Sequence, residues 1–411
     1  MLTVRDTVEQ NHRNQLLLSS VSKTGDTFPL MRILFGFALG LLLASTALAQ
    51  QPAISPDTGK WQDPSPHTVQ FVTVDKDVRL EVLDWGGTGR PVVLLAGLSN
   101  TAHVFDDFAP KLTPSFHVYG ITRRGFGASS APAIGYSADR LADDILAVLD
   151  ALKINNPVLI GHSIAGEELS SVATRYPKRI VGLIYLDAAH EYAYLNPERG
   201  DYQVDLNSLQ GTLQQLQVHS GDAHTIDDLL KVELPRFQRA LKVHEDDLAL
   251  ASKITQSIGP APADLTSFDA FHQFKTKFDG VEIPESELRQ QYLLKPDGSV
   301  GRTKASPAAF NGIISGEERF SKLQVPILAL FTIPRTHGTQ LDRLPPSLVT
   351  ALVNRETMQN QEQADAFKIG VPSAEVVIIP NANHGVFLSN ESEVLHHIAN
   401  FIGSLPAFRA Q

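Results

Sequence analysis

The sequence contains no cysteine among its 411 residues. This absence excludes disulfide bonds, thiolate metal sites and a cysteine nucleophile, and it carries no information about the redox state of the compartment. Blocks of like charge are also missing, because the net charge of -10 is spread along the chain. A chain without a basic patch is a poor match for nucleic acid, so we expect no nucleic-acid partner.

Long hydrophobic runs are missing as well. The most apolar stretch, residues 33–43, is about half of the ~20 residues that a membrane-spanning helix needs. It follows Met31-Arg32 and precedes the small-x-small sequence ALA at residues 47–49, which is typical of a secretory signal peptide. We therefore expect a signal peptide over residues 31–49 and an exported protein, periplasmic or secreted, without stable membrane insertion. A permanent membrane anchor is the alternative.

The polar lead, residues 1–30, shows no strong periodicity, and we hypothesise that translation starts at Met31. The remaining chain is long enough for a large core with an insertion. We assign residues 50–190 and 321–411 to two parts of one core, and residues 191–320 to an insertion between them. The sequence assigns no oligomeric state.

The first part of the core alternates between strand-like and helical patterns, which indicates an α/β sheet with mainly parallel strands. The expected strands are residues 69–74, 78–85, 91–97, 117–122, 157–163 and 181–187. Apolar residues at helical spacing predict a helix over residues 137–154. Three residues separate the first two strands, so these strands should form an antiparallel hairpin.

The insertion has helical segments at residues 226–241 and 245–258 and no strong strand pattern. Sheet-like sequence returns at residues 326–331 and 374–379, and an amphipathic helix over residues 391–402 closes the chain. A long insertion between core strands covers the carboxyl ends of the strands in many α/β proteins, so we interpret it as a cap. An interaction or structural appendage is the alternative.

The sequence PVLI at residues 157–160 leads directly into Gly161-His162-Ser163-Ile164-Ala165-Gly166 and then into a helical pattern. This is the local layout of a nucleophile elbow, in which a tight strand-to-helix turn presents a serine hydroxyl. Ser163 is the nucleophile candidate, and a small turn residue is the alternative. Ala165 replaces the second glycine of GxSxG, and we hypothesise that Gly166 supplies the close approach instead.

Three further motifs follow strands in the same order as in a known family. They are AGL at residues 96–98, RRGFGAS at residues 123–129 and NANHGVFL at residues 381–388. With the elbow, these motifs resemble the α/β-hydrolase superfamily, in its serine-nucleophile, esterase-like branch, over about residues 67–190 and 321–405. The resemblance implies a mainly parallel central sheet flanked by helices, with a large, mostly helical cap inserted between two core strands.

His384 is the candidate base, because it follows the last strand where the family places its histidine. The other histidines compete poorly: His396 and His397 fall inside the closing helix, and His337 lies in an irregular loop. His162 adjoins the nucleophile, and we expect it to point away from the site in a structural role.

The acid is where the sequence departs from the family, because residues 332–338 contain no acidic residue in the loop that most often carries it. Some relatives take the acid from the end of the preceding strand, where this chain has Asp187. We therefore predict Asp187 as the acid that orients His384, with Asp342, Glu356 and Glu191 in reserve.

The oxyanion hole should use the backbone N–H groups of Leu98 and Ile164. Ala96 stands where the family has a histidine that braces this loop, which leaves its conformation open. Gly97 would let the backbone approach a substrate closely. We expect Arg124 to tie loops together.

A serine with a histidine and an acid implies covalent acyl transfer without a metal or an organic cofactor. We expect hydrolysis of a carboxylic ester or related acyl substrate; lipase, thioesterase, lactonase and carbon–carbon hydrolase remain open. Relatives that open epoxides use aspartate as nucleophile, which disfavours that chemistry. Aromatics of the insertion indicate a small-molecule substrate with hydrophobic parts; they are Tyr192, Tyr194, Phe268 and Phe271. The alternatives are a non-catalytic binding protein and a peroxidase-like enzyme that forms peracids.

Overall fold

The computed structural model of the chain describes residues 61–219, 223–254 and 258–407. The polar lead and the predicted signal peptide lie outside these residues. Among the helices that are described, none is long and apolar enough to cross a membrane.

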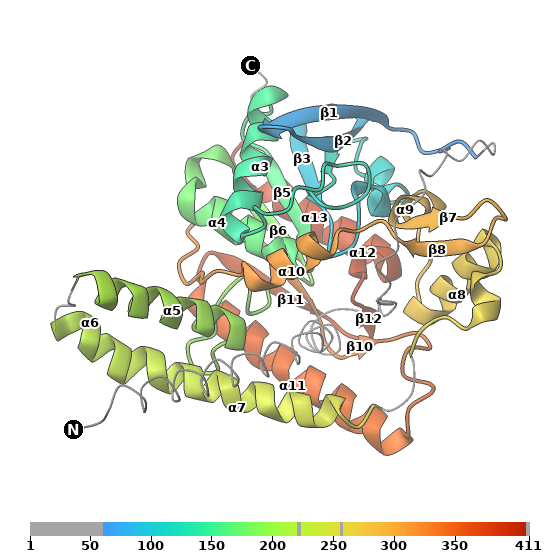
Figure 1. Cartoon of the computed structure of the whole chain (residues 1–411). Helices are drawn as coiled ribbons and strands as arrows, with labels where there is room; N and C mark the ends of the chain where they lie inside the picture. Colours follow the sequence, from blue (N-terminus) through green and yellow to red (C-terminus); the bar gives the residue numbers. More distant parts are fainter. Residues whose placement is uncertain (1–60, 220–222, 255–257, 408–411) are drawn as a thin grey trace, which may run out of the picture.

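An eight-stranded sheet forms the centre of the molecule (Figure 1). Its order is β1-β2-β4-β3-β5-β6-β9-β11. The strands are β1 (Thr68–Asp75), β2 (Val78–Gly86), β3 (Arg90–Leu95), β4 (Phe116–Ile121), β5 (Val158–His162), β6 (Gly182–Leu186), β9 (Ile327–Thr332) and β11 (Ala374–Ile379). β1 and β2 form the predicted antiparallel hairpin, β2 is also antiparallel to β4, and the other neighbours are parallel. The fold class predicted from the sequence is confirmed.

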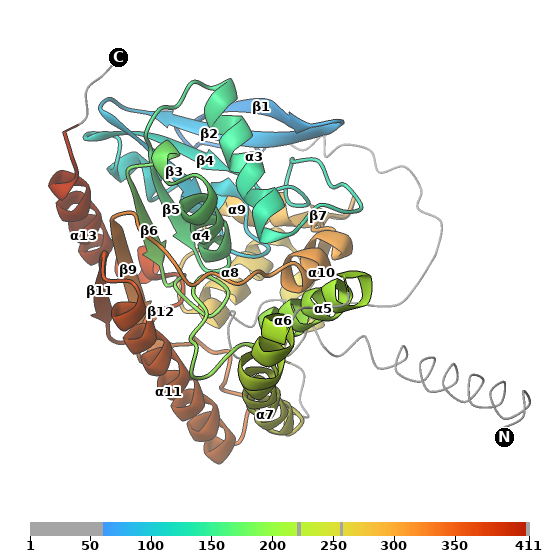
Figure 2. The same cartoon turned by 90° about the vertical axis from the view of Figure 1, so that its left-hand side faces the viewer.

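Apolar layers cover both faces of the sheet, because successive side chains of a strand point to opposite faces. On β9, Ala329 and Phe331 join one buried cluster, whereas Leu328 and Leu330 join the other. Helices α3 (Ala138–Ala151), α4 (Ala165–Arg175) and α11 (Pro346–Gly370) contribute to the first cluster. The second cluster contains residues of η1 (Ala102–Phe105), η2 (Ala109–Lys111), α12 (Val386–Ser389) and α13 (Glu391–Ser404). Figure 2 shows α13 on the opposite side of the sheet from α3 and α4.

Helix α11 has 25 residues and no counterpart in the sequence analysis. Several of its buried residues are polar, including Glu356, Gln359, Asn360 and Gln363. A helical pattern that counts only apolar residues does not detect a helix whose buried face is partly polar.

The insertion between β6 and β9 is mostly helical, as expected. Its helices are α5 (Tyr202–His219), α6 (Ala223–Asp228), the π-helix η4 (Leu229–Glu233), α7 (Leu234–Ala251), η5 (Pro262–Leu265), α8 (Phe268–Asp279), α9 (Glu285–Gln291) and α10 (Pro307–Ser315). Figure 1 shows α5 and α7 side by side, away from the sheet. Residues 226–241 are helical as expected, within α6, η4 and α7, and α7 continues through residues 242–244 and ends at Ala251.

The insertion also contains a small antiparallel hairpin, β7 (Tyr292–Leu294) and β8 (Val300–Thr303). The sequence shows no strong strand pattern at these positions. These strands have three and four residues, too few for an alternating pattern to stand out. A second short pair, β10 (Arg335–Thr336) and β12 (Ala382–Asn383), is parallel and joins the loops that follow β9 and β11.

Candidate active site

The nucleophile candidate lies on a tight turn between β5 and α4. Ser163 has a φ of 55°, in the left-handed region that a non-glycine residue adopts at a cost, and its side chain is buried. Its backbone N–H donates to the carbonyl of Leu186 at 3.3 Å. A Cβ on Gly161 would approach Leu169 to 2.9 Å, so glycine permits the close packing of helix on strand. The local structure is therefore a nucleophile elbow.

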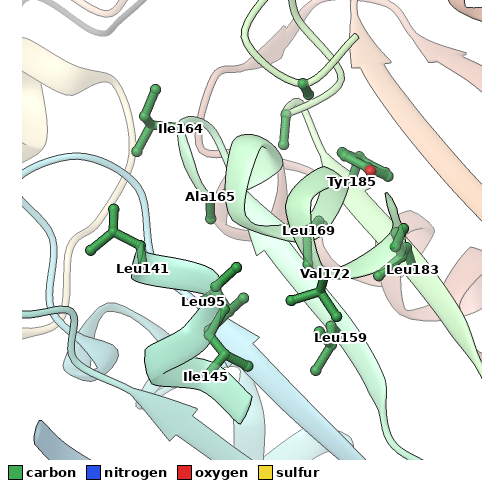
Figure 3. Close-up of a cluster of buried hydrophobic side chains, with 14 of the residues drawn as sticks. Leu95, Leu141, Ile145, Leu159, Ile164, Ala165, Leu169, Val172, Leu183 and Tyr185 are labelled. Atoms are coloured by element: carbon green, nitrogen blue, oxygen red, sulfur yellow. The ribbon is translucent and has the colours of Figure 1, made fainter. Parts of the chain in front are cut away.

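Gly166 performs the role that we expected of it. A Cβ at this position would lie 1.9 Å from the carbonyl oxygen of Ala188, so no larger residue fits without moving the backbone. Ala165 is fully buried and faces the apolar cluster beside Leu169 (Figure 3). The requirement for glycine has thus moved one position along the chain, and the hypothesis about Gly166 is confirmed.

The structure brings Ser163, His384 and Asp187 into one hydrogen-bonded chain. His384 Nε2 lies 2.9 Å from Ser163 Oγ, and His384 Nδ1 lies 2.7 Å from Asp187 Oδ2. An ionised carboxylate only accepts hydrogen bonds, so Nδ1 carries the proton and Nε2 is free to accept the serine proton. All three side chains are buried.

The loop after β9 holds Asp187 in place. Thr332 donates to it from its backbone N–H at 3.1 Å and from its hydroxyl at 2.6 Å, and Arg335 Nη2 lies 2.6 Å away. Burial favours the neutral acid, but Arg335 and hydrogen bonds from His190 and His384 hold the pKa of Asp187 well below its usual range. Asp187 is therefore an anion at neutral pH.

Sequence reasoning missed Thr332 and Arg335. The loop that lacks an acid contains instead a hydroxyl and a cation that stabilise an acid on the neighbouring strand. A signal was present in the sequence, since a carboxylate predicted at the end of a buried strand needs partners, and Arg335 is a cation in the adjacent loop.

None of the three reserve acids is bonded to His384 among the described residues. Glu356 pairs with Arg335 at 2.9 Å and with His337 at 2.8 Å. Glu191 pairs with Arg199 at 2.6 Å, and Asp342 is exposed. The carboxylate bonded to His384 is that of Asp187.

Burial and the positive charge of Arg335 lower the pKa of His384, and Asp187 only partly opposes this shift. The neutral imidazole, which is the form that accepts a proton, is therefore favoured near neutral pH. Burial likewise raises the pKa of Tyr192 well above its usual range, aided by the charge of Asp187, and a hydrogen bond with Ser163 opposes the rise. Tyr192 remains a neutral hydroxyl beside the nucleophile.

His162 does not point away from the site, contrary to expectation. It lines the same cavity as Ser163, and its Nε2 donates to the backbone carbonyl of His384 at 3.0 Å. Burial, with the nearby charge of His384, lowers the pKa of His162 to about 3, so the ring stays neutral. The structural role that we expected is present, because His162 holds the loop of the base.

Arg123 braces the loop in which the family's histidine is replaced by Ala96. Its guanidinium donates to the carbonyls of Ala96 at 2.8 Å and Gly97 at 3.3 Å and pairs with Glu168. A Cβ on Gly97 would lie 3.2 Å from Ser163 Cβ, so this loop lies directly against the nucleophile. The structure thus places Leu98 and Ile164, the predicted oxyanion donors, on the two segments that flank Ser163.

Arg124 binds elsewhere, as expected. Its Nε and Nη2 each donate to a different oxygen of Asp144, both at 2.6 Å. This buried bidentate pair ties the loop after β4 to α3 and does not contact the triad.

The insertion forms part of the wall of the cavity that contains Ser163. Val281, Ile283 and Phe310 of the cap face the cavity together with Leu388 of the core. Polar side chains line it too, namely Lys275, Asp279, Gln291, Tyr292 and Asn383. Tyr192, Tyr194, Phe268 and Phe271 are not among the residues that line it.

Glu287 of α9 fastens the cap to the loop beside the nucleophile. Its carboxylate accepts from Asn100 Nδ2 at 2.9 Å, from the backbone N–H of Thr101 at 3.0 Å and from the Thr101 hydroxyl. Burial raises the pKa of Glu287, and these hydrogen bonds oppose the rise. Cap position and loop geometry are therefore linked.

The family model described as "alpha/beta hydrolase fold" matches residues 90–391. The chain belongs to this family of hydrolases. The AB hydrolase superfamily protein YisY of Bacillus subtilis (strain 168) is 23% identical over 340 residues, which cover 81% of this chain and 99% of that relative. The bifunctional esterase/perhydrolase DCH of Acinetobacter calcoaceticus is 32% identical over 126 residues, 29% of this chain and 44% of that protein.

Solved structures agree on the fold. The crystal structure of E-2-(acetamidomethylene)succinate hydrolase aligns with a TM-score of 0.50 at 17% identity, covering 82% of this chain and all 100% of that one. This likeness supports the fold alone.

Proposed function

We propose that the protein is a serine hydrolase that cleaves a carboxylic ester or related acyl substrate through an acyl-enzyme. The observation that carries the proposal is the chain from Ser163 Oγ through His384 to Asp187, at 2.9 and 2.7 Å. A serine hydroxyl is a weak nucleophile until a neighbouring base takes its proton. His384 Nε2, 2.9 Å from Ser163 Oγ, is positioned to act as that base, which supports the proposal.

In the first half-reaction, Ser163 Oγ attacks the substrate carbonyl while His384 Nε2 takes its proton. The backbone N–H groups of Leu98 and Ile164 stabilise the oxyanion, and each such donor contributes about 3 kcal/mol to transition-state stabilisation. His384 then protonates the leaving alkoxide as the tetrahedral intermediate collapses. Water, deprotonated by His384, then attacks the acyl-enzyme. The bond from the acyl carbon to Ser163 Oγ breaks, Oγ takes the proton back from His384, and the carboxylic acid is released.

The cavity supports a small substrate that has both an apolar part and a polar group. Val281 and Phe310 line the cavity and would contact the hydrophobic part of the substrate. Lys275 and Asp279 pair at 2.7 Å within the wall, and although burial lowers the pKa of Lys275, Asp279 raises it above its usual value. A hydrogen-bonding group of the substrate faces this charged pair.

The reaction is tested with a fluorophosphonate probe and an activated p-nitrophenyl ester. The folded wild-type protein should be labelled at Ser163 and release a burst of p-nitrophenol. Ser163→Ala should abolish labelling, whereas His396→Ala, which changes an exposed histidine of α13, should not affect either signal. Absence of both signals in folded protein refutes the proposal and favours the non-catalytic binding protein.

The substrate proposal has its own test. The double variant Lys275→Met, Asp279→Asn removes the charged pair without leaving one charge buried alone. It should raise KM for esters with a polar acyl chain about tenfold and leave KM for p-nitrophenyl butyrate nearly unchanged. Equal changes for both esters contradict the assignment. The name of the Acinetobacter relative includes a second activity, perhydrolysis. This activity is tested by adding a carboxylic acid and hydrogen peroxide to the enzyme and measuring the peracid formed.

A further inference from the structure

A second group of histidine and carboxylate side chains lies outside the triad. Asp63 and His67 come from the segment before and at the edge of β1, and His103 and Asp106 come from η1 and the residue that follows it. Each offers one nitrogen or oxygen atom, and these atoms all lie within 4.8 Å of one another. None of the four lines the catalytic cavity.

The distances within this group match those of a metal site. His103 Nδ1 lies 3.1 Å from Asp106 Oδ2 and 3.2 Å from Asp63 Oδ2, and His67 Nδ1 lies 2.8 Å from Asp106 Oδ1. Ligands at the usual zinc distances of about 2.0–2.1 Å stand ~3.3 Å apart in a tetrahedron. These three separations are near or below this spacing, and His67 faces Asp63 Oδ2 with its other nitrogen, Nε2, at 3.8 Å.

Neighbouring groups orient the four side chains. His103 Nε2 faces Glu81 Oε1 at 3.6 Å, which is longer than a hydrogen bond but on the side where a carboxylate stands behind a metal-binding histidine. Asp106 accepts a hydrogen bond from Ser286 at 2.6 Å and another from Trp85 Nε1 at 3.2 Å. The rings of His67 and His103 pack edge to face, with centroids 5.0 Å apart. Burial and hydrogen bonds hold His67, His103 and Asp106 in place, whereas the side chain of Asp63 is 25% exposed.

We propose that Asp63, His67, His103 and Asp106 bind one divalent transition-metal ion, with Zn²⁺ as the expected occupant. Two imidazole nitrogens favour Zn²⁺ over Mg²⁺ or Ca²⁺, which prefer all-oxygen sites. Four protein ligands make a closed structural site. The missing cysteines exclude thiolate ligands, but histidine and carboxylate ligands do not need them.

The charge balance also favours a cation. Three carboxylates, Asp63, Glu81 and Asp106, meet two imidazoles, and a metal-bound imidazole is neutral. Without a metal, a proton on one of the imidazoles would balance part of this charge, because His67 and His103 both lie against carboxylates. A proton is thus the competitor of the metal for this site.

The ion would connect three parts of the chain. Asp63 and His67 belong to the segment leading into β1, His103 and Asp106 flank the end of η1, and Ser286 belongs to α9 of the cap. The loop at residues 97–101, beside Ser163, runs directly into η1. Metal binding would therefore stabilise the support of this loop without entering the reaction.

The test uses the full chain, treated with EDTA and then titrated with ZnCl2 by calorimetry, with bound metal counted by elemental analysis. The triad forms a second possible group, Asp187 with His190 and His384, so the titration is made on His384→Ala. We expect one Zn²⁺ per chain, a higher melting temperature with ZnCl2 and no rise with MgCl2.

Ligand and control variants decide the site. Asp63→Asn changes the most exposed of the four and should weaken Zn²⁺ binding at least tenfold, and Asp63→Asn with His67→Gln should abolish stoichiometric binding. Asp84→Asn is the matched control, because Asp84 pairs with His117 at 2.9 Å on the neighbouring strand β2. The proposal is overturned if folded His384→Ala protein takes up no Zn²⁺. It is also overturned if the ligand variants bind Zn²⁺ as tightly as Asp84→Asn does, and a protonated His103 is then favoured.

Discussion

Arg335 Nη2 lies 2.6 Å from Asp187 Oδ2, although 148 positions of sequence (335 − 187) separate the two residues. This contact links the loop after β9 to the end of β6. The loop that lacks an acid instead supplies Arg335, whose charge helps to hold the pKa of Asp187, directly after β6, well below its usual range.

Asp187→Asn should therefore lower kcat by several orders of magnitude while Ser163 remains in place. An amide can donate a hydrogen bond to His384 Nδ1 and so select the wrong tautomer, an effect of about 10⁴ in a well-studied serine protease. Glu356→Gln serves as the comparison, because Glu356 reaches the site only through Arg335. Steady-state kinetics check this order, and a larger loss for Glu356→Gln or Asp342→Asn would reassign the acid.

The pH profile should depend on Arg335. The neutral form of His384 is active and its pKa is lowered, so activity should persist as pH falls below the ordinary value of 6.5 and be lost at more acidic pH. Arg335→Met removes a positive charge, raises the pKa of His384 and should move the acidic limb of kcat/KM to higher pH.

Two controls accompany this profile. Arg335→Lys keeps the charge and should leave the limb near its wild-type position. Arg355→Met removes an arginine that pairs with Asp247 and should not move the limb. An unchanged limb in Arg335→Met would show that Arg335 does not act on the base.

Arg123 should act as a positioning residue for the oxyanion loop. Arg123→Gln combined with Glu168→Gln removes both members of a buried pair and leaves no lone charge. We expect kcat to fall about 10- to 100-fold with little change in KM, because the loop's N–H groups act on the transition state. Glu168→Gln alone should cost less. A loss confined to KM or to thermal stability contradicts this role.

Glu167 should make stability depend on pH. Burial, followed by the charges of Glu317 and Glu168, raises its pKa well above 4.5 in the folded state. As pH rises, Glu167 ionises first in the unfolded chain, because its pKa is lower there. The free energy of unfolding therefore falls between the unfolded-state and the folded-state pKa of Glu167, by ~1.4 kcal/mol per pKa unit.

Glu167→Gln cannot ionise and should raise the melting temperature at about pH 8 more than at about pH 5. Glu393→Gln alters an exposed carboxylate on α13 and should have little effect at either pH. Thermal unfolding curves at the two pH values test this. If the melting temperature changes between the two pH values by the same amount in Glu167→Gln and in the wild type, Glu167 is ionised in the folded protein.

Export remains a prediction from the sequence. N-terminal sequencing of the protein recovered outside the cytoplasm should begin near Gln50, because the small-x-small sequence ends at residue 49. Recovery with residue 2 intact would contradict both signal cleavage and translation from Met31.

Much of the fold was predictable because it depends on local patterns. The core strands, helix α3 and the β1–β2 hairpin follow from alternation and spacing within short windows. Helix α11 and the β7–β8 hairpin were missed for local reasons too: one has polar buried residues, and the other has very short strands.

The candidate site was predictable in its residues but not in its supports. Ser163 and His384 follow strands whose ends must meet at one edge of a parallel sheet, and Asp187 follows another. Thr332 and Arg335 belong to no motif, and the motif that begins at Arg123 does not reveal the contact of Arg123 with the loop at residues 96–97. The roles of all three depend on which loops lie together. The same is true of the cavity, whose wall comes from distant parts of the cap.

The sequence by itself determined the family, the elbow and the likeness of its loops to those of α/β hydrolases. Only the tertiary structure decided three contacts. Asp187 is hydrogen-bonded to His384, Arg123 braces the loop in which Ala96 stands in place of a histidine, and the ring of His67 packs against that of His103. The physical reason is one of range. Strand and turn preferences act between near neighbours, whereas a buried ion pair or a metal site forms only where the packed chain brings distant side chains together.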